Sequence, residues 1–176
     1  MEEQDLPEVS PGQIGLKWGM IYGIVSTIVN LIPVITETAI SIGFALIFVN
    51  IVIAFVFYIL ADREFKRLNG GQLTFGQGFK INMIAAVIAG VVRPLINYVY
   101  IKFIDTDYLD RLTRAMEEQW ERQGLNEQQI EQARSFASGT TNPEAQLIFG
   151  ILFVILGGLL WGSIAAAIQK KEEDEF

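Results

Sequence analysis

The fold is decided by Ala145–Gln169, which reads AQLIFGILFVILGGLLWGSIAAAIQ, twenty-five consecutive residues without a charge. A hydrocarbon core about 30 Å thick needs roughly 20 helical residues to cross it, so this stretch is long enough to span a bilayer. A water-soluble helix of this length normally carries charged residues on its outward face. Here Ile, Leu, Val and Phe would occur all round the helix. The stretch therefore predicts a transmembrane helix over about 144–168.

Two further windows have the same character. Trp18–Thr36, with 19 residues, and Thr38–Ala61, with 24, contain no charged residue, although the chain has 13 basic and 20 acidic residues. These windows predict transmembrane helices over 14–35 and 39–61, joined by a very short connection that holds Glu37. A soluble helical bundle is the alternative reading, and the lack of charged outward faces disfavours it.

A third span is predicted over 75–101, although Arg93 and Pro94 interrupt its apolar run. The uninterrupted part, Ile81–Val92, has 12 residues and is too short to cross alone, whereas the full range reaches membrane length. The chain is thus expected to be an all-α integral membrane protein. Its four transmembrane helices would form a single domain over 14–169.

The remaining segments are polar. An acidic flexible tail is expected over 1–13 and a charged tail over 170–176, and residues 62–67 should continue the second helix into water. Residues 105–142 show two amphipathic helical patterns, so an extramembrane helical hairpin is predicted between helices three and four. The apolar stripe of its first helix is made of Leu109, Leu112, Met116 and Trp120. Asn126 and Gln129 form a capping box that starts its second helix.

Four spans place both termini on one side of the membrane, and basic residues near the span ends indicate which side that is. Seven basic residues lie on the side of the termini, against five diluted over the 43 residues from 102 to 144. The seven are Lys17, Arg63, Lys66, Arg67, Lys80, Lys170 and Lys171. We therefore expect cytoplasmic termini and extracytoplasmic residues 102–143.

Three segments carry a resemblance to a known family. They are Leu73–Lys80 (LTFGQGFK) entering the third helix, Tyr100–Asp105 (YIKFID) leaving it, and Gln123–Ala133 (QGLNEQQIEQA) within the hairpin. In these segments and their order the chain resembles small bacterial four-helix membrane proteins catalogued as a domain of unknown function. The resemblance covers most of the chain. It implies the fold and a place in the bacterial inner (plasma) membrane, and it supplies no catalytic residues.

Polar residues inside the spans are costly in lipid, and Arg93 is the most informative of them. An arginine at a helix centre costs about 2.5–3.5 kcal/mol on insertion scales, so it should face protein or water. Asn30, Glu37 and Asn97 are expected near the same depth. Two interpretations follow: an outward-facing polar cavity that binds an anion or a polar headgroup, or an Arg93–Glu37 pair that fixes helix packing.

Small residues recur at every fourth position on two predicted spans. They are Gly15, Gly19 and Gly23 on helix one, and Gly158, Gly162 and Ala166 on helix four. Small residues at this spacing let helix backbones approach closely. The pattern favours packing of helix one against helix four, with a homodimer through one stripe as the alternative. Asn50 and Asn82 are each interpreted as an interhelical hydrogen bond.

The composition also bears on function. The chain has no His and no Cys, which excludes imidazole and thiolate chemistry. Within the predicted spans, no Asp or Glu lies in 18–36, 38–61, 81–101 or 145–169. We therefore expect no enzymatic activity, cofactor or metal, and the net charge of −7 disfavours a nucleic-acid partner. The favoured hypothesis is a membrane scaffold whose hairpin contacts a protein partner or the bilayer, as a monomer or homo-oligomer. The alternative is a small oligomeric channel or carrier for an anion or polar solute, using Arg93.

Overall fold

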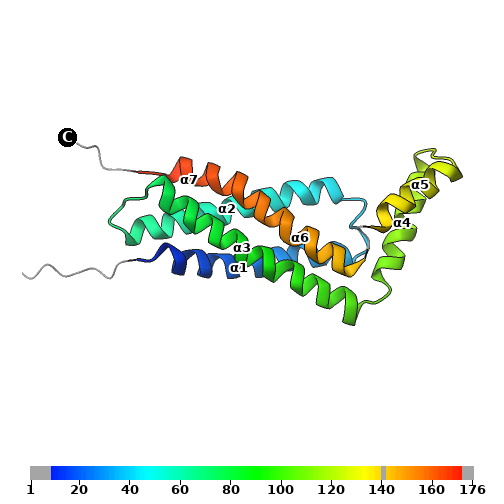
Figure 1. Cartoon of the computed structure of the whole chain (residues 1–176), viewed down its shortest axis with the longest axis horizontal. Coiled ribbons are helices and arrows are strands. Elements are labelled where there is room, and N and C mark those ends of the chain that lie inside the picture. Colours follow the sequence, from blue (N-terminus) through cyan, green and yellow to red (C-terminus); the bar gives the residue numbers. More distant parts are fainter. Residues whose placement is uncertain (1–8, 140–141, 172–176) are drawn as a thin grey trace, which may run out of the picture.

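The computed structural model describes residues 9–139 and 142–171, and almost all of them are helical (Figure 1). The elements in chain order are α1 (Pro11–Ile35), α2 (Gly43–Leu68), α3 (Phe75–Val99), η1 (Tyr100–Ile104), α4 (Tyr108–Arg122), α5 (Glu127–Ser138), α6 (Pro143–Gly157), η2 (Gly158–Gly162) and α7 (Ser163–Gln169). The two η elements are single π-helical turns. Most of the two tails expected from the sequence, 1–8 and 172–176, lies outside the described residues.

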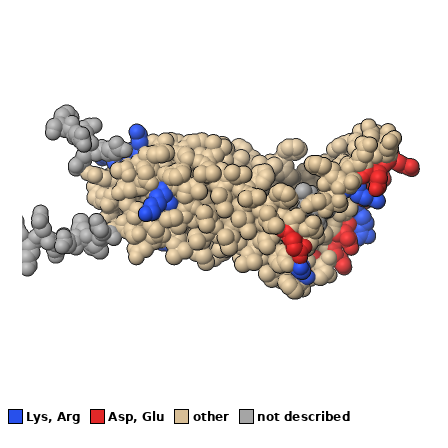
Figure 2. Space-filling view, in the orientation of Figure 1, with Lys and Arg blue, Asp and Glu red and all other residues tan. Residues whose placement is uncertain are grey.

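Among the residues that the structure describes, four helical segments are long and apolar enough to cross a membrane, which confirms the predicted fold class. They are Pro11–Ile35, Gly43–Leu68, Phe75–Ile104 and Pro143–Gln169. The third includes Arg93 and Pro94, so this interruption does not end the helix. On the face shown in Figure 2, a broad band along the middle of the bundle has no charged side chains, and the charges lie toward its two ends. Such an apolar belt is what a bilayer requires of a protein surface.

Local capping explains where several helices begin. The Thr74 side chain accepts a hydrogen bond from the Gln77 amide, and the Gln77 side chain accepts one from the Thr74 amide, at 3.2 and 2.9 Å. Asn126 and Gln129 form the same reciprocal box at the start of α5. Each box satisfies amides that the first helical turn leaves unpaired.

The connection between α1 and α2 is longer than predicted, because α2 begins at Gly43 rather than near residue 39. Residues 36–42 form a series of turns, in which Glu37 has a φ of 57°. A positive φ is uncommon for a residue with a side chain, and here it lets the chain turn sharply after α1. The short connection expected from the sequence is therefore a structured loop at the hairpin end of the bundle.

The predicted packing of helix one against helix four is wrong, because α3 lies between them and both glycine stripes face it. A Cβ added at Gly19 would lie 2.9 Å from the Cα of Ala85, so α1 sits directly on α3. On another side of α3, a Cβ at Gly162 would lie 3.0 Å from that of Asn82, and Gly78 faces Ala166 in the same way. The prediction missed that α3 carries small residues on two faces.

The hairpin of α4 and α5 projects from the end of the bundle opposite to the start of α1 and the end of α7 (Figure 1). Its two helices are joined by an ion pair between Arg134 Nε and Glu117 Oε1 at 2.8 Å. The stripe of α4 is half-buried, as are Ile130 and Ala133 of α5. At the other end of the bundle, backbone hydrogen bonds between Leu73 and Lys171 tie the α2–α3 loop to the end of α7.

Candidate functional site

The predicted polar residues meet at a cavity of about 590 Å³ in the half of the bundle that bears the hairpin. Arg93 and Asn97 reach it from α3, and Asn30 reaches it from α1. The polar lining is completed by Thr27 and Gln146, which the sequence interpretation did not include. The apolar lining comprises Leu31, Pro33, Val34, Ala39, Leu46, Pro94, Phe149, Gly150 and Phe153, and Tyr108 of α4 lies at the hairpin end. Three of the four residues of the predicted cluster thus share one cavity.

Arg93 is held by an asparagine pair. Its Nη1 donates to Asn50 Oδ1 at 3.0 Å. Asn30 and Asn50 hydrogen-bond to each other through both amide groups, at 2.8 and 3.1 Å, and so join α1 to α2. The expectation that Asn50 makes an interhelical hydrogen bond is confirmed. A guanidinium has five N–H donors, and among the described residues Arg93 uses one of its nitrogens in this way.

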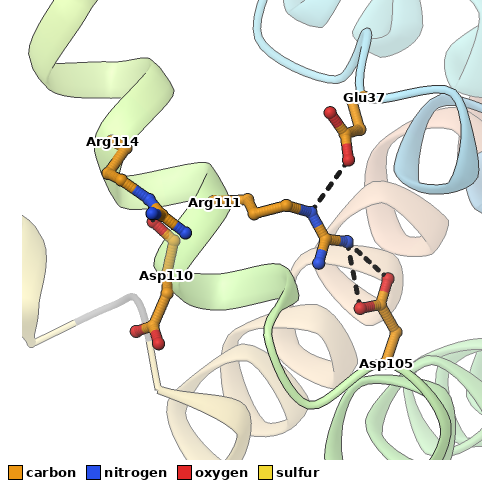
Figure 3. A network of polar contacts seen from close by, with 5 residues as sticks. All are labelled: Glu37, Asp105, Asp110, Arg111 and Arg114. Carbon is orange, nitrogen blue, oxygen red and sulfur yellow. Dashed lines mark hydrogen bonds and ion pairs between the residues drawn. The ribbon is translucent and has the colours of Figure 1, made fainter.

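Glu37 is not the partner of Arg93, which corrects the pairing considered from the sequence. It lies 2.9 Å from Arg111 Nε, through its Oε1, and Arg111 Nη2 also donates to Asp105 at 2.8 and 3.0 Å (Figure 3). The hydrogen bonds to Asp105 raise the pKa of Arg111, so this guanidinium stays charged. The reason for the difference is that the turn at Glu37 directs its side chain to α4, whose position the span pattern does not predict.

The Arg111 network fixes the hairpin over the cavity. Glu37 and Arg111 line a second, smaller cavity of about 90 Å³. Tyr108 and Ala39 line both cavities, so the first turn of α4 and the loop after α1 close the large one from the hairpin end. Burial raises the pKa of Tyr108, so its phenol remains a neutral hydrogen-bond donor.

Replacing Arg111 with alanine should loosen this closure without unfolding the bundle. The ion pairs are partly exposed, and such pairs contribute little to stability, so the free energy of unfolding should change only slightly. The amides of 36–42 and 105–108 should exchange hydrogen faster, as measured by mass spectrometry. Arg122→Ala is the control, because Arg122 pairs with Glu118 within α4 at 3.2 Å. Equal protection of these segments in both variants would contradict the assignment.

The sequence interpretation missed a second polar feature of the bundle, which is the buried side chain of Asp62. Asp62 was expected in water, yet it is fully buried and accepts a hydrogen bond from Asn82 of α3 at 3.0 Å. The expected interhelical hydrogen bond of Asn82 is thereby confirmed. The signal lay in the helical spacing, since Tyr58, Asp62 and Phe65 share one face of α2 and all three are buried. In the part of the chain that the structure describes, no three acidic side chains come close enough to hold a metal ion.

Comparison with known proteins gives one match. A family model described as "Protein of unknown function (DUF4199)" matches residues 17–171, which includes all four spans and the hairpin. No curated protein and no solved structure matches the chain.

Proposed function

The chain belongs to this family of unknown function, so we propose its function from its own geometry: a non-enzymatic multi-pass membrane protein that binds an anionic amphiphile. The charged headgroup would sit at Arg93, and the apolar tail would lie between α2 and α6. The proposal favours the binding or carrier alternative over the scaffold.

One observation carries the proposal: Arg93 lies on the wall of a cavity and forms no ion pair with any described residue. A cation removed from water and left without a counter-charge is costly, and arginines inside spans normally have a partner or face water. A carboxylate or phosphate bound in the cavity would supply that counter-charge, and a guanidinium binds both through two parallel hydrogen bonds.

The rest of the lining favours an anion over a cation. No Asp or Glu belongs to the described lining residues. The side chains of Asn97 and Gln146 bring amide groups to the cavity, whereas the Thr27 hydroxyl donates to the Gly23 carbonyl oxygen at 2.7 Å. Tyr108 adds a phenol that remains protonated.

The apolar lining favours a ligand with a hydrocarbon tail. Phe149 and Phe153 of α6 line the cavity and are 49% and 77% exposed, so the cavity borders on the surface that faces lipid. Leu46 lines it from α2. Ligand pockets commonly combine such an apolar lining with a few polar groups that fix orientation. A lipid or fatty acid could therefore enter sideways from the bilayer.

The hairpin supports a second candidate function, contact with a protein partner. Phe136 on α5 is 85% exposed, and the hairpin projects beyond the bundle (Figure 1). Recovery of a partner from membranes that is lost on deletion of 105–142 would support this candidate.

Charge distribution supports the proposed location. The excess of basic residues beside the termini favours cytoplasmic termini in a bacterial inner membrane, with the hairpin and the half of the bundle that holds the cavity toward the extracytoplasmic side. Labelling of cysteines introduced at Arg122 and Gln72 with an impermeant reagent tests this orientation, because the two lie at opposite ends of the bundle. Labelling of the position 72 variant alone in intact cells would contradict it.

The binding proposal is tested with three probes on the purified protein in nanodiscs. Oleate has the charge and the tail, oleyl alcohol has the tail alone, and inorganic phosphate has an anionic group alone. Oleate is expected to bind more tightly than both. Equal affinity for oleate and oleyl alcohol would contradict a role for charge, and phosphate binding as tight as oleate binding would contradict the amphiphile. Oleate flux into liposomes would distinguish a carrier from a binding protein.

A further inference from the structure

Asp62 lies in a closed polar site near the terminal end of the bundle. Its side chain is 0% exposed, as is that of Asn82, and Tyr58 one helical turn away is 1% exposed. Ile14, Phe65, Leu73 and Ile81 form a buried cluster with Ala61, next to Asp62 in the chain. The carboxyl group is thus enclosed by protein on a helix that spans the membrane.

Asp62 and Asn82 each have one buried oxygen atom without a hydrogen-bond partner among the described residues. Asn82 Nδ2 donates to Asp62 Oδ2 and to the Gly162 carbonyl oxygen, both at 3.0 Å. The other oxygens of these two side chains, Asp62 Oδ1 and Asn82 Oδ1, are buried and have no hydrogen-bond partner among the described residues. An ionised carboxylate and an amide oxygen are both acceptors, so neither can satisfy the other.

Within residues 9–139 and 142–171, no cation balances a charge on Asp62. The neighbours on its own helix are Tyr58 and Lys66, and the Lys66 ammonium donates to the Gln169 carbonyl oxygen at 3.2 Å. The groups that meet the site from α3 and from the η2–α7 segment are Gly78, Asn82, Gly162 and Ala166, all uncharged. From α1, Tyr22 packs against the ring of Tyr58. Among the described residues, Asp62 forms no ion pair, and a buried carboxylate without one is strongly disfavoured.

The site is also tightly packed. A Cβ added at Gly78 would lie 3.3 Å from Asp62 Oδ1, and one at Gly162 would lie 3.0 Å from the Cβ of Asn82. Metal cations with oxygen ligands take several ligands around the ion, which needs room. A proton, which needs no such room, therefore fits the site better than a metal cation.

We propose that Asp62 and Asn82 form a proton-binding site, in which the protonated Asp62 Oδ1 donates a hydrogen bond to Asn82 Oδ1. The proton comes from hydronium in the solvent, whose O–H bond breaks to leave water, and the new O–H bond on Asp62 converts the carboxylate to a neutral acid. It removes the buried charge and gives both unpartnered oxygens a hydrogen bond at once. Acid and amide are then joined by two hydrogen bonds, one in each direction.

The site links three segments of the bundle. Asp62 belongs to α2, Asn82 to α3, and the third partner is the carbonyl of Gly162 at the end of the π-helical turn η2. Loss of the proton would leave a buried negative charge between these segments and favour their separation. Ionisable groups placed this way in membrane proteins commonly carry protons, and π-turns often occur at functional sites.

The experiment measures the protonated carboxyl directly by infrared spectroscopy of purified protein labelled with carbon-13 at aspartate. At neutral pH we expect a carboxylic-acid carbonyl band that disappears in Asp62→Asn and persists in the control Asp110→Asn, whose carboxyl lies on the exposed surface of α4. The band should shift in Asn82→Ala, which removes the amide. Absence of the band in the wild type, or its loss on addition of sodium chloride, would overturn the proposal.

A second measurement uses stability. If the native state holds a proton that the unfolded chain releases, the free energy of unfolding falls as pH rises. The reason is that raising the pH disfavours the state with more bound protons, which here is the native state. The melting temperature of the wild type should therefore fall relative to that of Asp62→Asn between mildly acidic and mildly alkaline pH. Asp62→Asn should fold, because its amide can donate to Asn82 as the acid does. Parallel pH profiles for the two proteins would overturn the proposal, whatever the outcome of ligand binding at Arg93.

Discussion

Replacing Arg93 with glutamine should weaken the binding of oleate about ten- to a hundredfold, because hydrogen bonds to charged groups contribute about 1.5–3 kcal/mol and each 1.4 kcal/mol is a factor of ten. The fold should survive, since Asn50 Oδ1, which accepts from Arg93 Nη1, also accepts from Asn30 Nδ2. Binding of oleyl alcohol should be nearly unchanged. The measurement is titration of each ligand into the variant in nanodiscs.

The control is Lys102→Gln, which removes another positive charge from the same span. The Lys102 ammonium is exposed and pairs with Glu144, and neither residue lines the large cavity. Oleate affinity should therefore stay within about twofold of the wild type, because exposed ion pairs contribute little. An equal loss in both variants would show a general effect of charge and contradict a site at Arg93.

Substitution by leucine separates packing from ligand binding at the same position. Arg93→Leu also removes the hydrogen bond to Asn50, so it should disturb folding or function more than Lys102→Leu. Equal tolerance of the two leucine variants in expression and thermal stability would contradict any special role for Arg93.

The spans were predictable from the sequence because length and apolarity are properties of a continuous segment. A window such as Ala145–Gln169 must find an apolar environment wherever the rest of the chain lies. Helix three was predictable despite Arg93 and Pro94, because the apolar residues on both sides together reach membrane length. The capping boxes at Thr74 and Asn126 were predictable for the same reason, since each involves residues three positions apart.

The partners of each helix were harder to predict. A glycine stripe shows that a neighbour approaches closely, and it does not identify the neighbour. Gly15, Gly19 and Gly23 were matched to helix four because that helix has the second stripe. The structure shows that they contact Ala85, Ala89 and other residues of α3, where alanines allow the same close approach. The Glu37–Arg111 pair likewise depends on how a loop and the hairpin meet in space.

Asp62 shows how proximity in sequence can mislead. It precedes Arg63, Glu64, Lys66 and Arg67, so the segment has the composition of a solvated helix end. The face of the helix decides the environment instead: Asp62 is fully buried, and Arg63 beside it is exposed. Helical periodicity beyond the charge-free window would have grouped Asp62 with Tyr58 and Phe65.

Gly158→Ala should be among the most destabilising single substitutions in the bundle. Its Cβ would lie 2.2 Å from the Cβ of Ala86, whereas carbon atoms in contact prefer about 3.5–4.0 Å. It would also lie 3.2 Å from the hydroxyl of Tyr58. Overpacking of a well-packed core costs about 1–3 kcal/mol and occasionally more, and we expect the upper end because the obstacle is a short side chain on a helix.

Gly157→Ala is the matched control, one residue earlier in the same transmembrane span, Pro143–Gln169. A Cβ at Gly157 has Trp161 as its nearest neighbour, at 4.0 Å, so it would make an ordinary van der Waals contact without strain. This substitution should leave stability unchanged or raise it slightly, because alanine favours helix over glycine by about 1 kcal/mol. The two variants have the same composition and differ only in the helix face that receives the methyl group. The melting temperature of Gly158→Ala in detergent should therefore fall below that of the wild type, while that of Gly157→Ala should stay at or slightly above it. If both variants melted together, the close contact between η2 and α3 would be wrong, and with it the placement of Gly162 against Asn82 in the proton site.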